Sequence, residues 1–101
     1  MVAGAEGTLL VLNCLFGREI AEMHQALRDN DLRRAQQIDA RMHPVVHVLF
    51  QRPMLKMASR MKAALQLKGV IASSQTRLPV PTLMASEHSE LEAAMRAAGQ
   101  L

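Results

Sequence analysis

Two histidines with helical spacing are the first candidates for chemistry in this sequence. His43 and His47 lie four residues apart, which places both imidazoles on one face of a predicted helix. Such a pair can contribute two ligands to a zinc site. The catalytic form of this motif needs Glu directly after the first histidine, and Pro44 occupies that place. No further histidine or cysteine lies at ligand spacing, so we interpret the pair as polar residues at a helix or subunit boundary and expect no metal and no cofactor.

Basic residues form a second candidate site. Arg52, Lys56 and Arg60 are four residues apart and make a basic stripe on one predicted helix. They belong to a segment, residues 51–85, that holds several Lys and Arg and no Asp or Glu. The stripe predicts either a solvated face, which we favour, or a basic-helix binding module for a partner of opposite charge. Residues 51–68 contain no aromatic side chain to stack on bases, so no nucleic-acid partner is expected.

Nucleophilic catalysis finds little support in the sequence. Cys14 lies in the apolar run 8–16, where we expect it to be buried and inert. Lys56, Lys62 and Lys68 are expected to be exposed, whereas a catalytic amine needs an apolar pocket or a neighbouring cation. Neither a Gly-rich phosphate loop nor a spaced pair of carboxylates is present. We therefore expect no enzymatic activity from this chain and no small-molecule substrate.

Half of the 101 residues are hydrophobic, and the chain is long enough for a single domain, residues 1–101. Asp31 is the expected N-cap of the second helix, Pro44 should kink that helix without ending it, and Ser86 should cap the last helix. Gly69 and Gly99 should end the third and last helices.

The pattern predicts an all-α fold, a small bundle of about four helices, over residues 16–28, 32–50, 54–68 and 86–98. The expected apolar stripes are Phe16, Ile20, Met23 and Leu27; Ala35, Ile38, Met42, Val45 and Leu49; Met54, Met57, Met61 and Leu65; and Leu91, Ala94, Met95 and Ala98.

The apolar side chains of residues 8–16 must be buried against other residues, in this chain or in another copy. Residues 8–12 are apolar on both faces, as in a buried strand, but no partner strand is predicted. We expect that the run is helical and lengthens the first helix, or that it pairs with a second copy in a dimer or higher homo-oligomer. The candidate interface residues are Leu9, Leu10, Val11, Leu12, Leu15 and Phe16. The run is too short to span a bilayer, so no membrane partner is expected, and the single cysteine fits a cytoplasmic location.

The order of several short segments resembles a known family. These segments are Gly4-Ala-Glu-Gly-Thr-Leu-Leu-Val-Leu-Asn13, Arg18-Glu-Ile-Ala-Glu-Met23, Asp31-Leu-Arg-Arg-Ala-Gln-Gln-Ile38 and Arg77-Leu-Pro79. In this order they resemble the C-terminal part of the dihydrodipicolinate synthase / N-acetylneuraminate lyase family of class I aldolases, which are (β/α)8 barrels with appended helices. The resemblance implies that residues 8–30 correspond to the last barrel strand and helix, and residues 31–101 to the appended helical domain.

The same resemblance bears on catalysis. The family's imine-forming lysine, proton-relay tyrosine and carboxylate-binding loop correspond to upstream positions, and the present sequence contains no tyrosine. We therefore expect a non-catalytic helical remnant or fragment of such an aldolase, with a structural or oligomerisation role. Two alternatives remain open: part of a split or full-length pyruvate-dependent lyase or aldolase, and a basic-helix binding module formed by residues 51–85.

Overall fold

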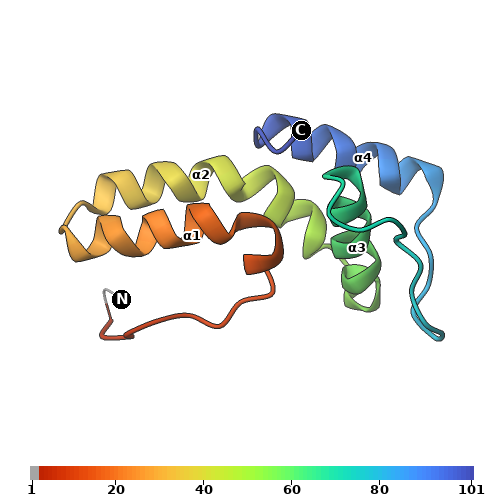
Figure 1. Ribbon diagram of the computed structural model, residues 1–101, viewed down its shortest axis with the longest axis horizontal. Coiled ribbons are helices and arrows are strands. Elements are labelled where there is room, and N and C mark those ends of the chain that lie inside the picture. The colour runs from red at the N-terminus through yellow and green to blue at the C-terminus, as the bar shows by residue number, and fades with distance from the viewer. Residues whose placement is uncertain (1–2) are drawn as a thin grey trace. The chain divides into compact units, whose positions relative to one another are not determined.

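The protein is all-α over the part of the chain that the structure describes. A computed structural model describes residues 3–101, and it contains four α-helices, one short 3-10 helix and no strand in that range (Figure 1). This confirms the predicted fold class. Within the described residues, no helix is both long enough and apolar enough to cross a membrane. The helices are α1 (Asn13–Arg28), α2 (Leu32–Leu49), η1 (Met54–Lys56), α3 (Met57–Leu67) and α4 (Ala85–Ala97).

The chain divides into two compact units, Met1–Met42 and His43–Leu101. The boundary falls inside α2, one residue before Pro44, which lacks a backbone N–H and therefore cannot form the helical hydrogen bond at its position. The helix continues through Pro44 to Leu49, as predicted. The single domain expected from the sequence stays a prediction, and the two units are described separately below.

The first unit is a helical hairpin made of α1 and the beginning of α2, which lie side by side and antiparallel (Figure 1). Asn30 turns the chain between them with a left-handed φ of 57°, a conformation that Asn tolerates better than most residues. The Asp31 carboxylate accepts a hydrogen bond from the backbone N–H of Arg34 at 3.0 Å, which confirms the predicted N-cap. Arg41 of α2 and Glu22 of α1 approach to 3.9 Å across the hairpin.

The predicted apolar stripe of α2 is buried in this unit, whereas that of α1 is buried only in part. Phe16 and Ile20 are buried, Met23 and Leu27 are half-buried, and Ala26, which is not in the predicted stripe, is fully buried. The buried apolar residues of the unit are Leu15, Phe16, Ile20, Ala26, Ala35, Ile38 and Met42.

The apolar run 8–16 divides into two parts. Helix α1 begins at Asn13, three residues earlier than the predicted start, but Phe16 has non-helical angles (φ −118°, ψ 33°) that separate this first turn from the main helix. Residues 8–12 form neither helix nor strand. The predicted helical lengthening therefore applies only to residues 13–16, and Leu9, Leu10 and Val11 before them stay exposed.

The second unit contains the end of α2, η1, α3, a connector over residues 68–84, and α4. Figure 1 shows α3 crossing α4, and these two helices are in contact. The predicted third helix, 54–68, instead starts with the 3-10 turn η1, and this changes the phase of its first residues, so that Met54 is exposed. Gly69 and Gly99 have φ values of 76° and 72° and end α3 and α4, as predicted. The buried apolar residues of this unit are Val45, Val48, Leu49, Met61, Ala63, Ala64, Leu91, Ala94 and Met95.

The start of α4 differs from the prediction. Met84, and not Ser86, is the N-cap residue of this helix. The Met84 side chain has no oxygen to bind the free N–H groups of the first turn. Glu87 at the third helical position instead accepts a hydrogen bond from the Met84 backbone N–H at 2.7 Å.

Candidate functional site

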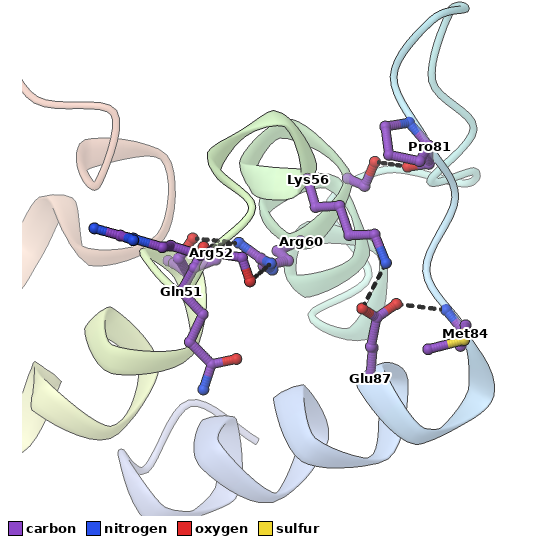
Figure 2. A network of polar contacts seen from close by, with 9 residues as sticks. Gln51, Arg52, Lys56, Arg60, Pro81, Met84 and Glu87 are labelled. Atoms are coloured by element: carbon purple, nitrogen blue, oxygen red, sulfur yellow. Dashed lines mark hydrogen bonds and ion pairs between the residues drawn. The ribbon is translucent and has the colours of Figure 1, made fainter.

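The second unit holds a cluster of polar contacts around Arg60, which we call the Arg60 cluster: Gln51, Arg52, Lys56, Ser59, Arg60, Pro81, Met84, Glu87 and Glu90. Arg60 lies on α3 and is only 5% exposed. Its guanidinium donates hydrogen bonds to the backbone carbonyls of Leu49 at 3.2 Å and Gln51 at 2.7 Å (Figure 2). A third, longer bond reaches the carbonyl of Arg52 at 3.4 Å.

The Leu49 carbonyl belongs to the last residue of α2, and the carbonyls of Gln51 and Arg52 lie in the turn that follows it. The last carbonyls of a helix have no partner within the helix and carry the negative end of its dipole. A guanidinium has five N–H donors in a planar fork, so one side chain can serve several carbonyls at once. Arg60 therefore caps α2 from a neighbouring helix and fixes the turn that leads to η1.

The second part of the cluster joins η1 to α4. Lys56 Nζ lies 2.7 Å from Glu87 Oε1, and both side chains are mostly buried. The other Glu87 oxygen accepts the Met84 N–H, so one carboxylate serves an ion pair and a helix start together (Figure 2). The hydrogen bond from Lys56, and next that from the Met84 backbone, hold the pKa of Glu87 below its usual value of 4.5.

Two further hydrogen bonds extend the cluster to the connector and along α4. The Ser59 hydroxyl donates to the carbonyl of Pro81, and the Gln51 side-chain amide donates to Glu90 at 3.0 Å. Together the contacts join the end of α2, η1, α3, the connector and the first turns of α4. Among the described residues, every buried side-chain nitrogen and oxygen has a partner. This arrangement holds helices together, and the charged side chains of Lys56, Arg60 and Glu87 are engaged in doing so, whereas Arg52 takes part only through its backbone carbonyl.

The predicted basic stripe looks different in three dimensions. Arg52 is exposed, Lys56 is mostly buried in its ion pair, and Arg60 is in the interior. The three side chains therefore do not share one solvated face, and the interpretation of the stripe as a solvated face is wrong. The reason is tertiary: Arg60 turns inward to the carbonyls at the end of α2 and in the turn after it, and the four-residue spacing of the stripe does not indicate these contacts. The inward position of Arg60 also weakens the binding module based on this stripe.

His43 and His47 are both exposed on α2. No group of three or more His, Cys, Asp or Glu side chains that could hold a metal ion occurs within residues 3–101. The two histidines therefore remain a candidate metal site with only two ligands.

The candidate interface residues divide into two groups. Leu9 is 99% exposed, Leu10 and Val11 are each 41% exposed, and Leu12 is half-buried. Leu15 and Phe16 are buried, because they belong to the first turn of α1 and face inward. The exposed apolar surface of the run is therefore Leu9, Leu10 and Val11, which we call the N-terminal apolar segment. The segment is linked to α1 by the neighbouring Thr8 hydroxyl, which lies 3.2 Å from Nε2 of His24.

Cys14 lies on the surface, contrary to the expectation that it is buried. It is exposed although the next two residues, Leu15 and Phe16, are buried. An apolar run is fully buried only when other residues pack against all of its faces, and in this run some residues are buried and others are exposed.

Glu87 and Ser59 were not among the sequence candidates for a site. Glu87 lies 31 residues from Lys56, and no spacing in the sequence indicates that the two side chains meet. Lys62 and Arg77 are also distant in the sequence, and both line one hollow of the second unit.

Comparisons with known proteins agree with the family resemblance. The profile of the Dihydrodipicolinate synthetase family matches residues 1–98. The chain is similar to 4-hydroxy-tetrahydrodipicolinate synthase 1 of Halalkalibacterium halodurans, with 34% identity over 91% of this chain and 30% of that protein. It is also similar to the 4-hydroxy-tetrahydrodipicolinate synthases of Desulfotalea psychrophila (30% identity over 94% of this chain and 31% of that protein) and Bifidobacterium longum (33% identity over 97% and 32%). The chain thus spans about a third of the length of the curated relatives that it matches.

Proposed function

Because the chain belongs to the Dihydrodipicolinate synthetase family, we propose that it is a non-catalytic helical part of a dihydrodipicolinate synthase-like lyase, with a structural role that includes oligomerisation. The chain matches only about a third of each relative, which supports the proposal that it corresponds to one part of the family's fold. The observation that carries the structural role is the Arg60 cluster, because its charged groups serve to join helices. We also propose that the chain acts in the cytoplasm, on the basis of its single cysteine.

The lysines support the absence of imine chemistry. A class I aldolase mechanism needs a neutral amine that attacks a carbonyl carbon. Lys56 donates to a carboxylate at 2.7 Å and Lys62 donates to a backbone carbonyl at 2.6 Å. In each of these contacts the lysine nitrogen donates to an oxygen of the protein itself, so neither side chain lies free in an apolar pocket.

Borohydride trapping tests this part of the proposal. The full chain is incubated with pyruvate and sodium borohydride and then analysed by intact-mass and peptide mass spectrometry. We expect no mass increase, because a reduced imine forms only on a reactive lysine. A stoichiometric adduct on Lys56, Lys62 or Lys68 would overturn the non-catalytic assignment. A relative with the complete barrel, such as the Halalkalibacterium halodurans enzyme, is the positive control for the trapping conditions.

The N-terminal apolar segment supports the oligomerisation role. Three consecutive apolar side chains are exposed, and burying them against another copy would remove this surface from water. We expect the chain to be a dimer or higher homo-oligomer in light scattering coupled to size exclusion. The double variant Leu9→Ser/Val11→Ser should shift it toward the monomer, whereas Val70→Ser, an exposed apolar residue in the second unit, should not. A wild-type chain that is monomeric at all concentrations would contradict this role.

A second candidate function is favoured by the high coverage of this chain in the comparisons, 91–97% of its length. In this view the chain supplies one part of a pyruvate-dependent lyase, and the catalytic part is supplied separately or on the same polypeptide. The test adds the chain to a relative from which the matching segment has been deleted. Restored synthase activity would support this function, and unchanged inactivity despite folded partners would count against it.

A further inference from the structure

A hollow in the second unit is lined by two cations and no acid. It measures about 490 Å³ and lies between Lys62 of α3 and residues Gln75–Leu78 of the connector, which include Arg77. Like charges that share a site repel each other, and an anion between them relieves that repulsion. The whole segment 51–85 contains no Asp or Glu, so the sequence around the hollow offers no counter-charge of its own.

The two cations differ in their internal contacts from Lys56 and Arg60 of the same segment. Lys56 is neutralised by Glu87, and Arg60 serves the carbonyls at the end of α2. Lys62 donates one hydrogen bond, 2.6 Å long, to the neutral carbonyl of Gln75. This contact holds the ammonium in place and leaves two of its three N–H donors for another acceptor. Arg77 is exposed, and no ion pair of either cation occurs within the described residues.

The connector that carries Arg77 is held by its own hydrogen bonds. The Thr76 hydroxyl donates to the carbonyl of Val80 at 3.3 Å, and the Val80 N–H donates to the carbonyl of Arg77 at 3.0 Å. The Gln75 N–H donates to the Ser73 hydroxyl oxygen at 3.2 Å, which leaves the proton of that hydroxyl for another acceptor. A loop that is already ordered loses less conformational freedom when it binds a ligand.

We propose that the hollow between Lys62 and Arg77 binds a small oxyanion, a phosphate or carboxylate group. Arg77 presents the planar fork that pairs with two oxygens, and Lys62 supplies a second, fixed positive charge. A second hollow of about 320 Å³ shares Gln75 and Thr76 with this one and adds the hydroxyls of Ser73 and Ser74. The proposal is independent of the structural role proposed above.

The test is an NMR titration of the full chain at low ionic strength with inorganic phosphate, acetate and glycerol in separate arms. We expect phosphate to cause saturable shifts at Lys62 and at residues 73–78. Saturation by acetate as well would assign the site to carboxylates in addition to phosphates, and saturation by phosphate alone would assign it to dianions. Equal binding of neutral glycerol would overturn the proposal, because recognition would then not depend on charge.

Variants locate the site. Arg77→Gln should weaken phosphate binding about tenfold, since it removes a charge-assisted pair. Arg77→Lys keeps the charge but loses the fork, so its loss should be smaller. Arg52→Gln is the matched control, because it removes an exposed arginine from the same basic segment outside the hollow and should change the affinity less than about twofold. Equal losses in Arg77→Gln and Arg52→Gln, or shifts that never saturate and spread over the basic surface, would refute a defined site.

Discussion

Replacing Arg60 with methionine removes the cap on the end of α2 while keeping a long side chain in the interior. Arg60 donates to three backbone carbonyls, and at 5% exposure water reaches its position poorly. Methionine fills much of the same space without a donor. The variant therefore leaves the carbonyl of Leu49 without its partner, at a helix end that has no other side-chain cap among the described contacts.

The size of the effect follows from the three distances. The 2.7 Å bond to the carbonyl of Gln51 is a strong charge-assisted contact, for which a net contribution of about 1.5–3 kcal/mol is typical. The bonds at 3.2 and 3.4 Å are weaker, and Arg52 is exposed enough for water to replace its bond. Burying a guanidinium without a carboxylate partner opposes this gain through lost hydration. We expect a net loss of about 2–3 kcal/mol, a large share of the ~5–15 kcal/mol typical of a domain.

Urea unfolding followed by circular dichroism at the helical minimum measures this loss. Arg60→Met should lower the free energy of unfolding by about 2–3 kcal/mol and the thermal midpoint by about 10–20 °C. Arg60→Lys should cost less, because one ammonium keeps the charge but cannot reach all three carbonyls. Arg52→Met is the control, and its effect should stay within about 0.5 kcal/mol because the side chain is exposed. An Arg60→Met variant as stable as Arg52→Met would refute the capping role.

Three further perturbations test other parts of the structure. The pKa of Glu87 is lowered in the folded state, so its contribution to stability is complete above its ordinary value of 4.5 and is lost as the pH falls through the lower folded value. Glu87→Gln should therefore flatten the pH dependence of the unfolding midpoint in that acidic range. An unchanged slope would count against the ion pair. Asp31→Ala should cost about 1 kcal/mol in urea unfolding, because it removes the N-cap of α2, whereas Asp39→Ala on the exposed face of the same helix should have little effect. Leu91→Ala should cost about 2–5 kcal/mol because Leu91 is fully buried, and Leu78→Ala at an exposed position should be nearly neutral; similar losses in the two would show that α4 is not packed as described.

Local signals in the sequence predicted the helices of this protein well. The seam Ala35, Ile38, Met42, Val45 and Leu49 is buried throughout, because residues three and four apart on a helix share one face. The chemistry of single residues also predicted the ends of elements: Asp31 offers an oxygen to a free N–H, and the two glycines adopt a positive φ after α3 and α4. These signals work because the groups they join lie within one helical turn of each other.

The candidate site was much less predictable. Arg60 and Lys56 looked like members of one charged stripe, but one caps a helix and the other pairs with a carboxylate 31 residues away. Cys14 and the Ser86 cap were also misjudged: burial of Cys14 depends on what covers the run, and the place of the α4 cap depends on Glu87, which Lys56 holds. Each error concerns a contact between segments that are distant in the chain.

The sequence by itself therefore determined the helical class, the buried face of α2, most helix ends and the family resemblance, since these depend on residue spacing and on local backbone chemistry. Only the tertiary structure decided what the charged residues do. It placed Arg60 on the last carbonyl of α2 and on the turn after it, paired Lys56 with Glu87, and brought Lys62 and Arg77 to one hollow. The physical reason is that the energy of a charge depends on its surroundings after folding, and a one-dimensional pattern does not contain those surroundings. The N-terminal apolar segment lies between the two cases: its residue types indicate burial, and the fold leaves Leu9, Leu10 and Val11 exposed.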